Sequence, residues 1–143
     1  MNAAALYPWL KALHVAAAIT FAGGVLAAAV MLRPSPGDRK SPLQSGTVGS
    51  LRTWQRNVTT PAMAIVWALG IVLALHGGSF ASLWLQGKLA LVVVLSALHG
   101  IQSGALRRLE SGAAVGMPGL RLSGALTIML VAGIAVLVIA RPL

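Results

Sequence analysis

The chain alternates between long apolar stretches and short polar connections. Apolar residues dominate four stretches, at about 8–32, 58–76, 84–106 and 120–140. A bilayer core of about 30 Å is crossed by roughly 20 apolar residues in a helix, so each stretch can span a membrane. The pattern predicts an all-α integral membrane protein in which four transmembrane helices form one bundle, a single domain over residues 1–143.

The composition supports this class. The 143 residues are 57% hydrophobic and only 9% charged, and the mean hydropathy is +0.85. A soluble domain of this size could not cover so much apolar surface with so few charges. The first stretch is longer than the apolar core of a signal peptide, and Lys11 is its only basic flank. We therefore expect it to remain as a span.

The net charge of +9 is unevenly distributed. The connection HGGSFASLW, after the second stretch, carries no charged residue. Eight of the eleven basic residues lie instead after the first and third stretches: Arg33, Arg39, Lys40, Arg52, Arg56, Arg107, Arg108 and Arg121. Arg141 is a minor exception. Short basic loops remain in the cytoplasm, which predicts that both termini lie outside the cytoplasm. Topology accounts for the charge, so no nucleic-acid partner is expected.

The first basic connection has two parts. The segment RPSPGDRKSPLQSGTVG, residues 33–49, is rich in Pro, Gly and Ser and predicts a flexible loop. SLRTWQRN, residues 50–57, predicts a short interfacial piece that leads into the second span. Pro61 would then fall in the opening turn of that span, where a missing amide hydrogen is harmless.

The third stretch carries a polar face. Lys88 and His99 are eleven residues apart, about 20° beyond three full helical turns, so they share one side with Gln102 and Ser103. An ionisable side chain at depth costs about 2.5 kcal/mol or more unless it finds water, a partner or a ligand. We therefore predict that this face points into the bundle.

Depth separates the ionisable residues into two levels. Lys88 and His99 lie about 16 Å apart along the helix axis. His14 of the first span is expected beside Lys88 at the outer level, where His76 could join them, and Met63 reaches the level of His99. Three of these residues have a simpler interpretation: Lys88 extends to the headgroups, His76 is a loop residue, and His99 packs against a neighbouring Ser or Thr.

These residue types suit a metal-containing cofactor. Histidine is the usual axial ligand of b-type haem, Met is a frequent partner, and lysine can hold propionates. We predict His14, His99 and Met63 as haem b-binding residues, with the two histidines as metal ligands, and Lys88 as the catalytic residue facing a carboxylate. His14 and His99 lie at depths too different for both to ligate one haem. Either a single haem uses ligands from one level, or the bundle holds two cofactor sites.

Copper is the alternative cofactor, because soft Met and His ligands suit Cu(I). The five methionines are scattered along the chain, however, without a cluster of Met and His. No cysteine is present, which excludes thiolate metal sites and disulfides.

Three stretches carry a family resemblance. WLKALHVAAAITFAGGVL, RTWQRNVTTPAMAIVWALGI and WLQGKLALVVVLSALHG resemble, in order and spacing, the HemJ family of bacterial membrane protoporphyrinogen IX oxidases and the related CopD-like membrane domain. The similarity runs from about Trp9 to Leu109. The chain departs from the HemJ pattern at the end of the first span, which lacks an aromatic-rich segment, and at Phe21, where a tryptophan is common.

The resemblance implies a protein of the bacterial inner membrane with four or five helices that binds haem b. It would oxidise protoporphyrinogen IX to protoporphyrin IX in haem synthesis and pass electrons toward a quinone or another respiratory-chain acceptor. By position, the family's functional residues correspond to His14, Met63, Lys88 and His99. Two alternatives stay open: copper transport or resistance of CopD type, and a non-enzymatic subunit of a larger membrane complex. The small-residue faces of spans one and four would also suit a homodimer in the lipid bilayer.

Overall fold

The computed structural model describes residues 3–33, 42–77, 80–113, 115 and 118–140. Within these residues all regular structure is helical, and four helices are long and apolar enough to cross a membrane. The predicted all-α, four-span bundle is confirmed. The elements are α1 (Ala3–Met31), α2 (Pro42–Trp54), the π-helix η1 (Gln55–Thr59), α3 (Thr60–Gly77), α4 (Leu83–Glu110), the 3-10 helix η2 (Pro118–Leu122) and α5 (Ser123–Ile139).

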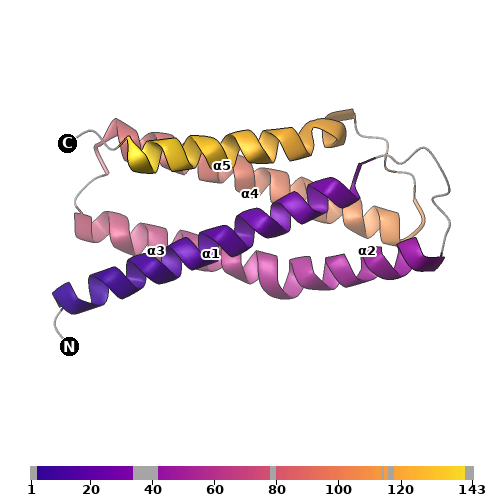
Figure 1. The fold of residues 1–143 in the computed structure, drawn as a ribbon, viewed down its shortest axis with the longest axis horizontal. Coiled ribbons are helices and arrows are strands. Elements are labelled where there is room, and N and C mark those ends of the chain that lie inside the picture. The colour runs from indigo at the N-terminus through magenta and orange to yellow at the C-terminus, as the bar shows by residue number, and fades with distance from the viewer. Residues whose placement is uncertain (1–2, 34–41, 78–79, 114, 116–117, 141–143) are drawn as a thin grey trace.

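The bundle has two distinct ends (Figure 1). α1 begins, and α5 finishes, at one of them, which we call the termini end. α2 and the connection from α4 to η2 lie at the other, which we call the arginine end, because Arg52, Arg107 and Arg121 stand in the last turns of α2, α4 and η2. These three arginines therefore lie on one side of the apolar region, as the charge pattern predicts.

The second span differs from the prediction. Residues 33–57 were expected to be a loop followed by a separate interfacial piece, but from Pro42 onward the chain is helical and continues through η1 into α3 without a break. Pro42 opens the helix, where its fixed φ and missing amide hydrogen are tolerated. Burial of Val48, which is 2% exposed, against Ala28 and Leu106 stabilises α2 in spite of Gly46 and Gly49.

Pro61 explains the π-helix in this long segment. A proline inside a helix cannot donate to the carbonyl four residues earlier, and its ring clashes with that carbonyl. Here the preceding turn widens, so that the backbone N–H of Thr60 donates to the carbonyl of Gln55, five residues back. Pro61 lies in the first turn of α3, as predicted, but it does not open the helical run, which begins before it and continues through η1. The extra residue of the π-helix brings Gln55 and Thr59 to buried positions.

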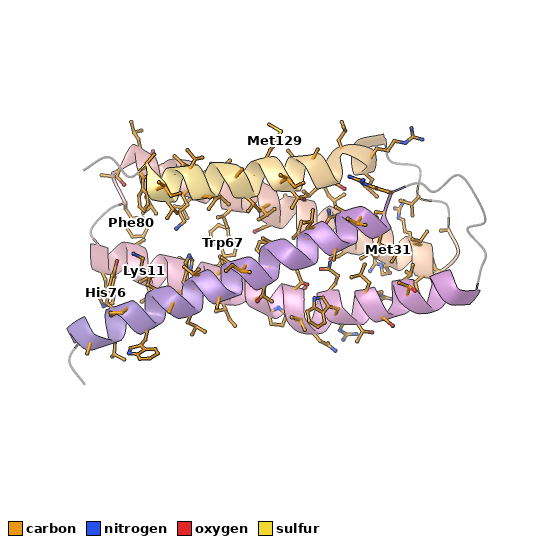
Figure 2. All side chains as sticks on the ribbon, in the orientation of Figure 1. Lys11, Met31, Trp67, His76, Phe80 and Met129 are labelled. Atoms are coloured by element: carbon orange, nitrogen blue, oxygen red, sulfur yellow. The ribbon has the colours of Figure 1, made fainter. Side chains whose placement is uncertain are left out.

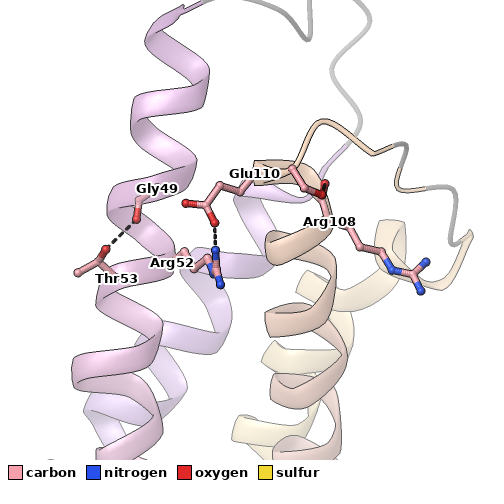
Figure 3. A network of polar contacts seen from close by, with 6 residues as sticks. Gly49, Arg52, Thr53, Arg108 and Glu110 are labelled. Carbon is pink, nitrogen blue, oxygen red and sulfur yellow. Dashed lines mark hydrogen bonds and ion pairs between the residues drawn. The ribbon is translucent and has the colours of Figure 1, made fainter.

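Two apolar clusters hold the helices together. The central one includes Phe21, Val66 and Leu95 and joins α1, α3, α4 and α5. The second, around Ala28, Val48 and Leu106, lies at the arginine end. There Arg52 of α2 also forms an ion pair with Glu110 at the end of α4 (Figure 3). The packing thus fixes α2 and α4 side by side at this end.

Candidate functional site

A cavity of about 360 Å³ lies in the half of the bundle nearer the termini end. α1, α4 and α5 supply most of its walls, which are apolar except for His14 and Lys88. Ile19 and Ile139 line it and are also 68% and 85% exposed, so the cavity opens on the lipid-facing side between α1 and α5. An apolar molecule dissolved in the bilayer could enter here without crossing water.

His14 occupies the inner wall of this cavity and is only 9% exposed. Gly70 on α3 makes room for the imidazole, because a Cβ at that position would lie 3.2 Å from Cε1 of His14. The Nδ1 atom is buried and has no hydrogen-bond partner among the described residues. Buried polar atoms are nearly always paired. The ring also lies within reach of the backbone of Val66. His14 therefore keeps one ring nitrogen, Nδ1, for a partner that comes from outside the chain.

Lys88 lies on α4 at the same level. It lines the cavity with His14, which confirms the predicted match in depth. Its ammonium nitrogen stands 5.7 Å from the centroid of the Trp84 ring, within the range of a cation–π interaction. The Trp84 indole N–H in turn donates to the backbone carbonyl of Leu137, which ties this part of α4 to α5. The charge is thus held beside an apolar cavity.

His76 does not join this pair. It is exposed in the last turn of α3, and its Nδ1 lies 2.9 Å from the carbonyl oxygen of Val72 in its own helix. Figure 2 places it at the termini end, outside the cavity lining. Its position agrees with the simpler interpretation of a residue near a loop.

His99 lies in a different environment, 4% exposed and away from the cavity lining. The Thr60 hydroxyl donates to the carbonyl of Gln55 at 2.9 Å and lies 3.1 Å from Nε2 of His99. Because that hydroxyl has only one hydrogen, it accepts from Nε2–H, and Nδ1 keeps its lone pair. The ring of Phe21 meets the imidazole edge-on, with centroids 5.7 Å apart. These contacts match the interpretation of a packing histidine.

Met63 packs against the central apolar cluster and is not part of the cavity lining. It stands one helical turn after Thr60, which contacts His99. Figure 2 shows two other methionines far from each other, Met31 near the arginine end and Met129 on the outer side of α5. In the described part of the chain, no group of three or more His, Cys, Asp or Glu side chains gathers as a metal site. The structure therefore joins His14 with Lys88, and separates His99 and Met63 from them.

The polar face predicted on the third span does turn inward, since His99 and Gln102 are 4% and 0% exposed. η1 adds two buried polar residues that the sequence pattern did not indicate, Gln55 and Thr59. The Gln55 amide donates to the carbonyl of Gly24 at 2.6 Å, and a Cβ on Gly24 would overlap the Thr59 side chain. A proline in the middle of a long helical segment was the available signal for this turn.

Several atoms in this polar layer have no hydrogen-bond partner among the described residues: Oε1 of Gln55, Oγ1 of Thr59, Nδ1 of His99 and both amide atoms of Gln102. The bundle thus contains two sites of different character, an apolar cavity around His14 and a polar layer beside the arginine end. No family model, no curated protein and no solved structure matches the chain.

Proposed function

We propose that this protein is a haem b-binding membrane oxidoreductase that oxidises protoporphyrinogen IX to protoporphyrin IX. The observation that carries the proposal is the buried His14, whose Nδ1 has no partner among the described residues, on the wall of an apolar cavity that also holds Lys88. The resemblance of three stretches to HemJ proteins supplies the reaction. We further propose the bacterial inner membrane as its location, with the arginine end in the cytoplasm.

The donor set favours haem over a copper ion. A tetrapyrrole brings four nitrogens of its own, so the protein needs to contribute only one or two axial ligands. Copper bound by protein side chains alone needs several soft ligands at one point. His14 and Lys88 share the cavity, while Met63 and His99 do not line it. A site with one imidazole therefore fits the cofactor that needs fewest ligands.

The chemistry of the cavity suits part of a porphyrin ring. Its volume of about 360 Å³ is at the lower end of the range for small-molecule pockets, and its open side lets lipid cover part of a larger ligand. Porphyrins of this class carry carboxylates on an apolar ring. The Lys88 ammonium can form a charge-assisted hydrogen bond to such a carboxylate at the rim.

In this mechanism the chain binds and orients the porphyrin and keeps water out of the cavity. A bound haem supplies one-electron chemistry. The imidazole of His14 would hold the metal, and close contact with Gly70 keeps the ring in place. Lys88 orients the porphyrin through a carboxylate, and the apolar walls exclude water from the reacting region. Both a porphyrinogen and a quinone acceptor can reach the opening between α1 and α5 through the bilayer. The electrons and protons removed from each porphyrinogen would leave on successive quinone molecules, which are reduced to quinols.

The test is the reduced-minus-oxidised optical spectrum of the purified full-length protein. We expect the α band of b-type haem in the wild type, its loss in His14→Ala, and its retention in His76→Ala, a matched control for an exposed histidine. His99→Ala should also keep the band. A wild-type protein without the band, or a His14→Ala variant that retains it, would refute the assignment.

Metal analysis of the same preparations separates the alternatives. Copper without iron would favour a transport or resistance protein of CopD type. If neither metal is bound and the substitutions leave function unchanged, a structural subunit of a larger complex is favoured. Oxidation of protoporphyrinogen IX with a quinone acceptor, followed by the fluorescence of the product, then tests the activity itself.

A further inference from the structure

A second hollow, of about 380 Å³, lies at the arginine end between α4 and the segment that joins α2 to α3. It is separate from the cavity around His14, and its lining is polar and basic. Six side chains with hydrogen-bonding groups line it: Arg52, Gln55, Arg56, Thr60, Ser103 and Arg107. Three of these are arginines, which favour an anionic occupant.

Two glycines create the space. Gly100 and Gly104 line the hollow one turn apart on α4, and a Cβ at either position would meet nothing within 4 Å. Close packing therefore does not explain them, in contrast to Gly24, whose missing Cβ is required by Thr59. The α4 surface is bare at this level, and a ligand can lie against the helix backbone.

The positive charge of the hollow is only partly neutralised. Arg52 forms an ion pair with Glu110, which is the single carboxylate side chain among the described residues. The chain has one other acidic residue, Asp38, which lies outside them. Arg56 and Arg107 therefore face the hollow without a carboxylate partner in the part of the chain that the structure describes.

Gln55 provides a second, independent observation. It lines the hollow and is only 3% exposed, and its amide nitrogen donates to the carbonyl of Gly24. This bond fixes the side chain, so Oε1 is left as a buried acceptor with no partner among the described residues. An ionised phosphate oxygen is itself an acceptor, so it cannot donate a hydrogen bond to Oε1 of Gln55. The occupant should therefore carry a hydroxyl donor together with its negative charge.

The depth of the hollow fits the membrane surface. Trp54 is 52% exposed on the same helical segment, between Arg52 and Arg56. Exposed tryptophans are enriched at the level of the headgroups, and basic pockets between helices on the cytoplasmic side bind anionic headgroups. We infer that this hollow binds the hydroxylated phosphodiester headgroup of an anionic glycerophospholipid, with Arg56 and Arg107 on the phosphate and Gln55 on a hydroxyl.

The simpler interpretation is that the arginines only set the topology. Arg108 supplies the comparison, because it follows Arg107 directly, is exposed and does not line the hollow. Figure 3 shows its side chain directed away from Arg52 and Glu110. A purely topological role would make the two neighbouring arginines equivalent, whereas a headgroup site distinguishes them.

The experiment is native mass spectrometry of the full chain released from vesicles of equal parts phosphatidylglycerol and phosphatidylcholine. We expect one retained phosphatidylglycerol in the wild type. Arg56→Gln with Arg107→Gln should reduce its retention about 25-fold, since each basic residue near an anionic surface contributes roughly a factor of five. Gly104→Leu should also abolish retention by filling the hollow. Arg108→Gln should behave as the wild type.

Two further arms sharpen the result. Glu110→Gln releases Arg52 from its ion pair and should raise retention up to about fivefold. Glycerol 3-phosphate at millimolar concentration should not displace the lipid, which distinguishes a headgroup site from a site for soluble phosphates. The inference is overturned if phosphatidylcholine is retained equally, if Arg108→Gln loses as much lipid as the double variant, if Gly104→Leu retains it, or if the soluble phosphate displaces it. It does not depend on haem, so a spectrum without an α band leaves it standing.

Discussion

The regions around His14 and His99 differ in what surrounds an otherwise similar buried imidazole. His14 stands on an apolar wall with Nδ1 unpartnered, beside a cavity that opens to lipid. His99 donates to Thr60, meets the ring of Phe21 and lies in a polar layer near the arginines. Burial alone therefore does not identify a functional histidine. Because Nδ1 of His99 also lacks a partner among the described residues, an unpaired nitrogen does not distinguish the two either. What distinguishes them is the surroundings: an apolar cavity with Lys88 for His14, and the contacts of Thr60 and Phe21 for His99.

One aromatic ring separates the regions. Phe21 lines the apolar cavity on one side and packs edge-on against His99 on the other. The chemistry proposed for the cavity is thereby isolated from the polar layer. Substitutions on the two sides should accordingly have different kinds of effect: on ligand binding near His14, and on stability near His99.

The largest expected effect on stability is at the polar layer. Gly24→Ala should lower the free energy of unfolding by about 1–3 kcal/mol, because the new Cβ would overlap Thr59. Gly23→Ala is the matched control, since a Cβ there meets nothing within 4 Å and should leave stability unchanged or slightly higher. Unfolding by dodecyl sulfate in mixed micelles, followed by circular dichroism, measures both. Equal losses would show that α1 and η1 are less closely packed than described.

The next effect concerns the apolar cavity and rests on the proposed function. Lys88→Gln should weaken the binding of protoporphyrin IX about tenfold, because a hydrogen bond to a charged group contributes roughly 1.5 kcal/mol or more. Arg108→Gln, at an exposed cation of the arginine end that does not line the cavity, should bind as the wild type. Porphyrin fluorescence during titration provides the dissociation constants. If both variants bind equally well, Lys88 is not the carboxylate partner.

A smaller effect on stability is expected from removing the Thr60 hydroxyl that contacts Nε2 of His99. Thr60→Val removes the hydroxyl that lies 3.1 Å from Nε2 and should cost about 0.6 kcal/mol, a typical value for hydrogen bonds between membrane helices. Thr20→Val is the control, because the Thr20 hydroxyl is exposed and donates only to the carbonyl of Ala16 in its own helix. Haem content should not change in either variant. A loss of haem in Thr60→Val would move the cofactor toward His99.

The smallest effect belongs to the ion pair at the arginine end. Arg52→Gln should lower stability by less than about 0.5 kcal/mol, because the two side chains are 41% and 39% exposed and water screens the pair. The difference from the wild type should shrink further as salt is added. A loss above 1 kcal/mol, insensitive to salt, would indicate that the pair is shielded from water.

The sequence predicted those parts of the fold that depend on simple periodicity. Long apolar runs indicated the four spans, and the spacing from Lys88 to His99 correctly indicated an inward polar face. The match in depth between His14 and Lys88 followed from the rise per residue. These features are local, since each depends on one helix and on the thickness of the bilayer.

Contacts between helices were harder to predict from the sequence. The composition of residues 33–49 favoured a loop, but burial of Val48 against α1 and α4 outweighs the low helix propensity of its glycine neighbours. Nothing in the spacing indicated that Thr60 would reach His99, or that Gln55 would be fixed by the carbonyl of Gly24. Such pairings arise from the crossing of helices, which a single sequence does not specify.

The unbroken helical run from Pro42 to Gly77 has a mechanical consequence. From Trp54 to Gly77 it rises about 34 Å, close to the thickness of the hydrocarbon layer, so the preceding dozen residues extend roughly 18 Å beyond it. α2 packs there against the ends of α1 and α4, so the segment connects the arginine end rigidly to the apolar region. A thinner or thicker bilayer that changes the tilt of α3 would therefore also shift α2 against these two helices.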